Sequence, residues 1–348
     1  MKTHIILLVT ILVSLSVSSC KTEPVAAPVQ KTDISEFLGQ WTIDIEGGTS
    51  VGWLEVRQAE GYIDADLLWQ GGSVLPVANV FLAADKNLIV TRTSNAVKTR
   101  DANNNPLRTM VITNWLEVSK EGDKIKGFLL NPRRSGLGVD STEFIGTKLP
   151  APPPAPDLAS VKFGTPVELF NGKDLTGWRL INEKQKNGFA AENGVLTNNP
   201  VQVEGAPHVS YGNLRTDQEF EDFNLKLEVN VPAGSNSGVY LRGMYEVQVV
   251  DSYKKELDPH NMGAVYSRIK PTIGAEKPAG EWQTMDITLC NRHATVILNG
   301  IKIIDNQPIY GPTGGAMKSD VFAAGPIYLQ GDHGKVSYRN IVLTPIIK

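Results

Sequence analysis

The chain is poor in cysteine, in net charge and in helical periodicity. Two cysteines among 348 residues are too few for a disulfide framework. Lys and Arg number 34 against 37 Asp and Glu, a formal net charge of −3, so the chain lacks the basic balance of a nucleic-acid-binding protein. No stretch has the 3.6-residue apolar period of a long amphipathic helix. No Gly-x-Gly-x-x-Gly fingerprint indicates a dinucleotide cofactor.

What the chain does contain is glycine, proline and short alternating runs. Its 32 glycines and 21 prolines predict many turns and an all-β fold. Hydrophobic residues make up 41% of the chain and charged residues 20%, which is enough apolar surface for a packed core. The length is that of about two domains.

The first residues are typical of a lipoprotein signal peptide, residues 1–20. Lys2 and His4 precede an apolar run over residues 5–17, which has the length of a signal-peptide core and is short for a membrane span. Val17-Ser-Ser-Cys20 resembles a bacterial lipobox, so we expect Cys20 to be lipidated and residues 21–32 to be a tether. This predicts a bacterial cell-envelope protein, periplasmic or at the cell surface and anchored in the membrane by lipid. An ordinary signal peptide with an incidental cysteine is the alternative.

A proline-rich segment divides the rest of the chain. Residues 150–156 contain five prolines, which favour stiff polyproline II and cannot join the interior of a sheet. The sequence therefore predicts one domain over residues 33–149 and another over residues 157–348.

The first predicted domain is a small antiparallel β-barrel or sandwich. Residues 33–149 hold about eight short runs of period 2, separated by glycine- and aspartate-rich turns such as Gly71-Gly72. They contain no histidine cluster, nucleophile motif or phosphate loop. We expect an accessory role, as a spacer or glycan-binding module, with a second catalytic domain as the alternative.

The second predicted domain is a jelly-roll β-sandwich. Residues 157–348 again alternate in short strands, and Asn299-Gly300 is a type I′ hairpin signal between residues 295–298 and 301–304. Two packed antiparallel sheets are the architecture that such strands favour. The glycine-rich loop 310–317 does not match a phosphate loop and is interpreted as a groove edge.

Seven segments of the second domain resemble one family, the 3-keto-disaccharide hydrolases, also described as 3-keto-glucoside 1,2-lyase and 3-keto-2-hydroxy-glucal hydratase domains. They follow in order across roughly half the chain. The resemblance implies a concanavalin A-like β-sandwich that acts on glycosides already oxidised to a ketone at C-3, with a glycoside 3-oxidoreductase as functional partner. The segments are LFNGKDLTGW (169–178), NSGVYLR (236–242), YEVQVVD (245–251), GAVY (263–266), GEWQ (280–283), LNG (298–300) and GPIYLQGDHGKVSYRNI (325–341).

The ketone makes such a substrate reactive in a way that an ordinary glycoside is not. It acidifies the C-2 proton, so one base can remove that proton and the enolate can expel the substituent at C-1. Adding water across the new double bond completes a net hydrolysis. The site needs a base, an acid for the leaving group and donors for the enolate oxygen.

Three residues are predicted to be catalytic: Glu246, Asp251 and His333. The two-residue period of the strand at 245–250 places Glu246 and Gln248 on one face, opposite an apolar face. His333 lies between two strands with glycines nearby, and Asp332 beside it can fix its tautomer.

Other polar and aromatic residues of the family segments and nearby loops are predicted to bind the substrate. The guanidinium of Arg242 has five fixed donors for sugar oxygens or the enolate, and the solvated ion pair Arg242–Glu246 is the non-catalytic interpretation. No His-x-x-His spacing defines a metal site and no cofactor is assigned. Loop histidines and acids nevertheless leave room for a divalent metal ion that would chelate the ketone. The predicted substrate-binding residues are Asn236, Tyr240, Arg242, Gln248, Tyr266, Gln330, His208 and His260.

Two other functions stay open. Glu246-x-Gln248-x-x-Asp251 has the layout of the catalytic strand of laminarinase-like retaining hydrolases, which act on unoxidised glycans with two carboxylates about 5–5.5 Å apart. The sandwich is also common among lectins, so a non-catalytic carbohydrate-binding protein is the second alternative.

Overall fold

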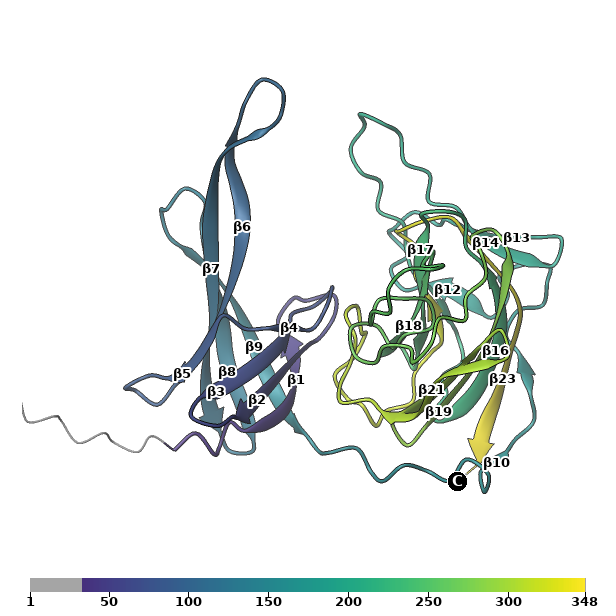
Figure 1. Cartoon of the computed structure of the whole chain (residues 1–348), viewed down its shortest axis with the longest axis horizontal. Helices are drawn as coiled ribbons and strands as arrows, with labels where there is room; N and C mark the ends of the chain where they lie inside the picture. Colours follow the sequence, from purple (N-terminus) through teal and green to yellow (C-terminus); the bar gives the residue numbers. More distant parts are fainter. Residues whose placement is uncertain (1–32, 348) are drawn as a thin grey trace, which may run out of the picture. The chain divides into compact units, whose positions relative to one another are not determined.

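The computed structural model describes residues 33–347, and these residues form an all-β structure without α-helices (Figure 1). Every pairing between named strands is antiparallel. The predicted fold class is confirmed. The expected signal peptide, Cys20 and tether lie outside the described residues. Within residues 33–347, no helix has the length and apolar character to cross a bilayer.

Residues 39–149 form one nine-stranded sheet in the order β4-β3-β2-β1-β9-β8-β7-β6-β5. Strands consecutive in the chain are adjacent in the sheet, except β4 and β5, which form its two edges, and β1 also pairs with β9. Its strands are β1 (Gly39–Ile45), β2 (Gly52–Gln58), β3 (Ile63–Leu68), β4 (Leu75–Pro76), β5 (Asn79–Leu82), β6 (Leu88–Arg100), β7 (Pro106–Glu121), β8 (Lys124–Pro132) and β9 (Val139–Leu149).

This sheet curls toward a barrel because one short segment connects its two edges. The N–H of Val77 donates to the carbonyl of Ala65 on β3, and the N–H of Ala78 donates to the carbonyl of Thr91 on β6. The enclosed side is filled by alternating residues such as Trp41 and Ile43, both fully buried. The sequence predicts a small antiparallel β-barrel or sandwich here, and the structure has one sheet curled toward a barrel.

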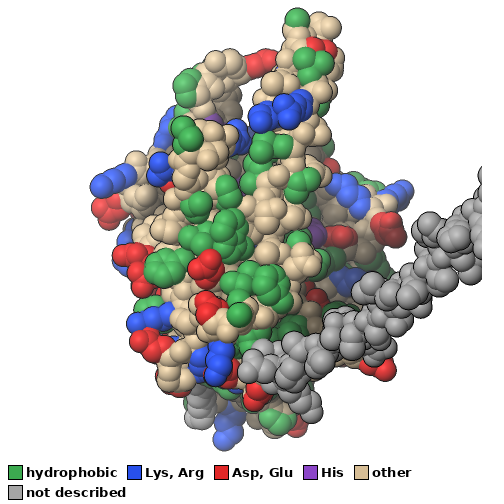
Figure 2. Space-filling view, turned by 90° about the vertical axis from the view of Figure 1, so that its left-hand side faces the viewer, with side chains coloured by type: hydrophobic (Ala, Val, Ile, Leu, Met, Phe, Trp, Pro, Cys, Tyr) green, Lys and Arg blue, Asp and Glu red, His purple; other side chains and the backbone are tan. Residues whose placement is uncertain are grey.

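The outer surface of the first sheet is partly apolar. Figure 2 shows hydrophobic side chains gathered on one face of the molecule. Large apolar side chains in isolated exposed positions are normal, but a contiguous patch is a feature of interaction surfaces. The exposed ones on β7, β8 and β9 are Leu107, Val111, Phe128, Val139 and Ile145.

Residues 162–347 form two sheets that pack as a jelly-roll sandwich. The larger has the path β13-β14-β23-β16-β19-β20-β21, with β10 and β11 also on β23, and the smaller has the order β12-β15-β22-β17-β18. The strands are β10 (Lys162–Phe163), β11 (Val167–Glu168), β12 (Trp178–Leu180), β13 (Phe189–Glu192), β14 (Val195–Asn198), β15 (Leu214–Thr216), β16 (Phe223–Asn230), β17 (Asn236–Leu241), β18 (Tyr245–Val250), β19 (Trp282–Cys290), β20 (His293–Leu298), β21 (Ile301–Pro308), β22 (Tyr328–Leu329) and β23 (Val336–Ile347).

The sandwich core follows from the two-residue period. On β16, Phe223, Leu225, Leu227 and Val229 are buried, while the residues between them are less buried or exposed. The hairpin predicted at Asn299-Gly300 joins β20 to β21, and both residues have the positive φ (51° and 82°) that a type I′ turn needs.

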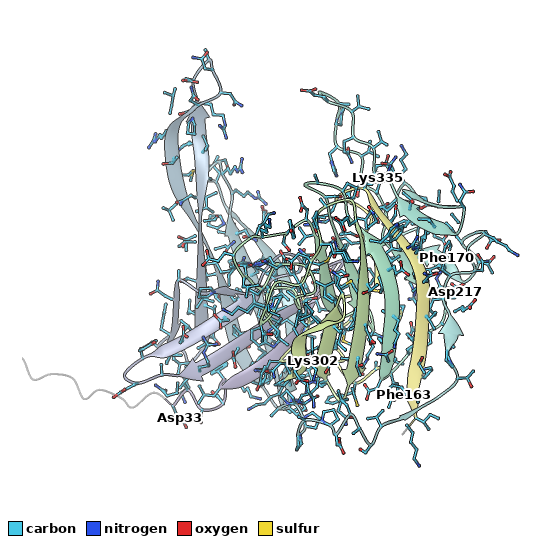
Figure 3. The ribbon with its side chains drawn as sticks, turned by 45° about the vertical axis from the view of Figure 1, so that its right-hand side comes forward. Asp33, Phe163, Phe170, Asp217, Lys302 and Lys335 are labelled. Carbon is cyan, nitrogen blue, oxygen red and sulfur yellow. The ribbon has the colours of Figure 1, made fainter. Side chains whose placement is uncertain are left out.

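Strand β23 brings the His333 loop to one end of the sandwich. Figure 3 shows Lys335, just before β23, and Phe163, which pairs near the far end of that strand, at opposite ends of it. Residues 34–348 form one compact unit, and three residues of the first sheet, Trp53, Leu68 and Leu149, join the apolar cluster of the sandwich. The division into two domains at residues 150–156 stays a prediction.

Candidate functional site

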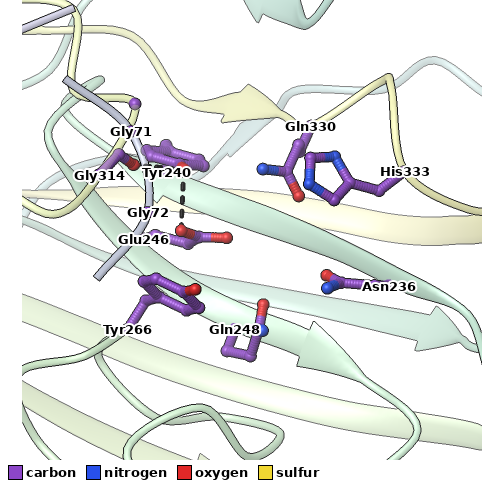
Figure 4. Close-up of a pocket in the computed structure, with 11 residues that line it drawn as sticks. Gly71, Gly72, Asn236, Tyr240, Glu246, Gln248, Tyr266, Gly314, Gln330 and His333 are labelled. Carbon is purple, nitrogen blue, oxygen red and sulfur yellow. Dashed lines mark hydrogen bonds between the residues drawn. The ribbon is translucent and has the colours of Figure 1, made fainter. Parts of the chain in front are cut away.

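A cavity of about 210 Å³ opens on the smaller sheet of the sandwich (Figure 4). It collects seven of the residues predicted from the sequence, together with four glycines. Its lining residues are Gly71, Gly72, Asn236, Tyr240, Glu246, Gln248, Tyr266, Gly314, Gly315, Gln330 and His333.

Strands β17 and β18 supply the polar floor of this cavity. They pair with Tyr240 opposite Glu246 and Gly238 opposite Gln248. Because side chains alternate along a strand, Tyr245, Val247 and Val249 enter the core while Glu246 and Gln248 line the cavity, as the sequence period predicts.

The carboxyl group of Glu246 is almost completely buried. Glu246 is 4% exposed, and its Oε2 accepts a hydrogen bond of 2.8 Å from the Tyr240 hydroxyl. Burial raises the pKa of Glu246 to about 8, and the hydrogen bond from Tyr240 opposes part of that rise. The carboxyl group therefore carries a proton in most molecules at neutral pH.

Tyr240 is held rigidly beside this carboxyl group. Its hydroxyl oxygen lies 2.7 Å from the carbonyl of Gly314, and its ring stacks on Tyr328 with centroids 3.8 Å apart. Burial raises the pKa of the Tyr240 phenol well above its usual range. The phenol therefore remains a hydrogen-bond donor across the physiological pH range.

His333 lies on the loop between β22 and β23 and points into the same cavity (Figure 4). Partial desolvation lowers the pKa of its imidazole below 6.5, and the neighbouring Asp332 carboxylate opposes this shift. The imidazole is therefore mainly neutral at pH 7, while Glu246 is mainly protonated. Two titrating groups whose pKa values are displaced in this way are suited to act as a base and an acid.

Two amide side chains leave buried acceptors at the cavity. Oδ1 of Asn236 and Oε1 of Gln330 accept no hydrogen bond within the described part of the chain. Figure 4 shows both side chains near His333. Because buried polar atoms are normally paired, these oxygens are suited to a ligand that carries hydroxyl donors.

His260 lies next to Tyr266 and Ser73, outside the cavity lining. Its Nε2 lies 2.8 Å from Oγ of Ser73, its Nδ1 contacts Asp258, and its ring meets Tyr266 edge-on with centroids 4.8 Å apart. His260 was predicted to bind the substrate, but it is not among the lining residues, and its ring contacts Tyr266, which is.

The prediction for Arg242 needs correction. Strand β17 ends at Leu241, so its alternation does not reach Arg242, which has a positive φ of 56°. Its guanidinium is buried and donates to the carbonyls of Val321 and Ala323. The predicted Arg242–Glu246 pair is not among the ion pairs of residues 33–347.

Asp251 and His208 also lie away from the cavity lining. Strand β18 ends at Val250, and Oδ2 of Asp251 accepts a hydrogen bond of 3.0 Å from the N–H of Gly234. His208 is exposed, with its Nε2 3.0 Å from Oδ2 of Asp332. Glu246 is consequently the one carboxylate among the residues that line the cavity.

The side chains present do not form a metal-binding cluster. Across residues 33–347, no three His, Cys, Asp or Glu side chains gather in a way that could hold an ion. Glu246 and His333 are the only two of these types among the lining residues.

Gly71 and Gly72 were missed as lining residues, whereas Gly314 and Gly315 belong to the loop predicted as a groove edge. The Gly71-Gly72 pair carries an ordinary turn signal. A local pattern cannot distinguish a turn that lines a cavity from one that faces solvent.

Comparison with known proteins identifies the part of the chain that carries the cavity floor. The model of the 3-keto-alpha-glucoside-1,2-lyase-like domain family matches residues 165–344. No curated protein matches the chain.

Solved structures resemble about half of the chain. A Parabacteroides distasonis protein, provisionally named a glycosyl hydrolase, is 30% identical over 56% of this chain and 92% of its own, with a TM-score of 0.42. SCLam, a non-specific endo-β-1,3(4)-glucanase of family GH16, is 12% identical over 56% of this chain and 93% of its own (TM-score 0.35). The carbohydrate-binding module CBM66 from Bacillus subtilis is 14% identical over 47% of this chain and 93% of its own, with a TM-score of 0.32.

Proposed function

The chain belongs to the 3-keto-α-glucoside-1,2-lyase-like family, and on this premise we propose that it is an enzyme that cleaves 3-keto-glycosides at the anomeric bond. The observation that carries the proposal is the pairing of a protonated, buried Glu246 with a neutral His333 on one cavity.

Elimination uses both groups in the protonation states that they hold at pH 7. The His333 imidazole takes the C-2 proton, and the electron pair passes into the enolate of the C-3 ketone. The enolate collapses to a C-1–C-2 double bond as the C-1–oxygen bond breaks. The Glu246 carboxyl group gives its proton to the departing oxygen, leaving a carboxylate and an imidazolium.

Hydration runs the same proton transfers in reverse. The Glu246 carboxylate takes a proton from water as the oxygen bonds to C-1, and the His333 imidazolium returns its proton to C-2. Both residues regain their starting states, and the sum is hydrolysis of the glycosidic bond. The amide side chains of Asn236, Gln248 and Gln330 line the cavity, and their proposed role is to bind sugar hydroxyls and the enolate oxygen.

The retaining mechanism has less support. It requires two carboxylates about 5–5.5 Å apart. Only one carboxyl group, that of Glu246, is among the residues that line the cavity, and the carboxylate of Asp251 accepts a hydrogen bond from the N–H of Gly234. A mechanism with one carboxyl acid and one imidazole base uses the residues that are present.

The test compares a 3-keto-glucoside with its unoxidised parent, using the absorbance of the enone and the release of the aglycone, with and without chelator. We expect turnover of the oxidised substrate alone, and losses of at least about a hundredfold in Glu246→Gln and His333→Ala. Both variants should keep the thermal unfolding cooperativity of the native protein. Equal cleavage of the unoxidised glycoside would favour the laminarinase-like alternative, and binding without turnover would favour a lectin.

We further propose that Cys20 is lipidated, that the protein acts in the bacterial cell envelope, and that a glycoside 3-oxidoreductase supplies its substrate. The lipobox-like Val17-Ser-Ser-Cys20 supports the lipid anchor. The oxidoreductase is proposed because the substrate must carry a ketone and this chain has no dinucleotide-binding motif for oxidising a sugar. Cys20→Ser should move the protein from the membrane fraction to the soluble fraction, whereas an unchanged distribution would contradict the anchor.

A further inference from the structure

A loop of the first sheet contributes to the cavity whose floor is formed by β17 and β18 of the sandwich. Residues 69–74 join β3 to β4, and this loop supplies Gly71 and Gly72 to the cavity lining. The sheet and the sandwich are parts of one compact unit, residues 34–348. The cavity is therefore not complete with the family segment at residues 165–344 alone.

The loop is anchored on both sides of its glycines. Before them, the carbonyl of Gln70 accepts a hydrogen bond of 3.0 Å from the N–H of Gly315. After them, Oγ of Ser73 lies 2.8 Å from Nε2 of His260, and the N–H of Val74 donates to Oγ of Ser267 over 2.9 Å. These bonds hold Gly71 and Gly72 in place as a wall.

At Gly71 and Gly72 the cavity wall consists of backbone atoms without side chains. A Cβ added to Gly314 would lie 2.2 Å from the carbonyl oxygen of Gly72, so the two loops touch backbone to backbone. A Cβ added to Gly71 would meet no atom within 4 Å, and Gly71 is not among the glycines with positive φ. Glycine at 71 is thus required neither by backbone conformation nor by protein packing.

We propose that this loop closes one end of the substrate groove and restricts the pocket to a single terminal sugar unit. The inference rests on the proposed function and adds a limit on its substrates: the oxidised sugar must be the terminal unit of the glycoside. The cavity of about 210 Å³ is smaller than pockets that enclose drug-sized ligands, which occupy about 300–1,000 Å³.

The first experiment places a side chain in the open space at Gly71. In Gly71→Leu, KM for a 3-keto-glucoside should rise at least tenfold while the melting temperature stays within about 2 °C, since a Cβ at this position would meet no atom within 4 Å. Ala102→Leu is the matched control, because Ala102 lies on an exposed turn of the same sheet. An unchanged KM in Gly71→Leu would overturn the proposal.

The second experiment compares two substrates on the native protein: a 3-keto-disaccharide and an oligosaccharide oxidised only on an internal unit. We expect kcat/KM for the internal ketone to be at least a hundredfold lower. Equal rates would show that the groove is open past Gly71 and would contradict the proposed closure.

Calorimetric binding of the 3-keto-disaccharide separates this inference from the proposed function. If the native protein binds it without turnover, the catalytic proposal fails, and a tenfold weaker Kd in Gly71→Leu than in Ala102→Leu would still support the loop as a pocket wall. If the native protein neither binds nor converts it, both proposals fail.

Discussion

Gly238 leaves the space that the Glu246 carboxyl group occupies. The two residues lie on paired strands, and a Cβ added to Gly238 would lie 2.3 Å from Oε1 of Glu246 and 2.9 Å from its Cδ. Gly238 has no positive φ, so its lack of a side chain is a requirement of this contact and not of the backbone.

Gly238→Ala should therefore displace the carboxyl group while leaving the sheet intact. We expect kcat to fall by about tenfold to a hundredfold, because the acid loses its position relative to the leaving oxygen. Gly164→Ala is the control, since its added Cβ would meet only ordinary contacts of 3.5 Å or more. Steady-state kinetics and thermal unfolding of both variants check this. Equal kcat values in the two would contradict the assigned position of the acid.

The pH dependence of kcat/KM should be bell-shaped. Activity needs His333 neutral, and the pKa of His333 is lowered below 6.5, so the rate rises with pH on a limb below 6.5. It also needs Glu246 protonated, and the pKa of Glu246 is raised to about 8, so the rate falls on a limb near pH 8. A profile that keeps rising through pH 9 would show that a protonated Glu246 is not required.

Tyr240→Phe should move the alkaline limb to higher pH. The Tyr240 hydrogen bond lowers the pKa of Glu246, so removing the hydroxyl lets burial raise that pKa further. Tyr328→Phe is a matched control, because Tyr328 stacks on Tyr240 but donates to the carbonyl of Gly315. The control should leave the limb in place. A limb that shifts equally in both variants would assign the effect to ring packing.

Inside strands the two-residue period predicts which side chains reach the cavity, whereas Tyr266, Gln330 and His333 lie outside strands and were predicted from the family segments. Glu246 and Gln248 share a face because both lie within β18, where the two-residue period holds. Arg242 and Asp251 follow the last residues of β17 and β18, so the period does not place their side chains. Past a strand end, turn geometry decides where a side chain points, and the pattern no longer applies.

The contribution of the first sheet could not be read from local pattern. Gly71 lies far along the chain from Glu246, and their proximity depends on hydrogen bonds such as Gln70–Gly315 that no periodicity encodes. The pKa of Glu246 has the same origin, because it results from burial by residues of several strands and loops. The protonation state of Glu246 and the lining of the cavity thus depend on tertiary packing, whereas the face of β18 that carries Glu246 can be predicted from the sequence.

Asp251→Asn should keep most of the activity. Asparagine preserves the shape of the side chain and an oxygen that can accept the N–H of Gly234. We expect kcat/KM within about threefold of the native value, whereas loss of one of two essential carboxylates would cost about a hundredfold or more. Kinetics on the 3-keto-glucoside decide between these, and a loss of the larger size would restore the two-carboxylate mechanism.

Glu246→Gln should make the protein more stable at alkaline pH. The folded state raises the pKa of Glu246 from 4.5 to about 8, so between these values the folded protein binds a proton that the unfolded chain releases. The free energy of unfolding of the native protein should therefore fall as pH rises through this window, by up to roughly 5 kcal/mol at about 1.4 kcal/mol per pKa unit.

The neutral amide removes this dependence, so the difference in melting temperature between Glu246→Gln and the native protein should grow from pH 5 to pH 9. Glu192→Gln, on an exposed position of β13, is the control and should follow the native curve. If Glu246→Gln also follows the native curve, the carboxyl group is ionised at neutral pH and cannot serve as the acid. Gained stability together with lost turnover would identify Glu246 as a group retained for chemistry at the expense of the fold.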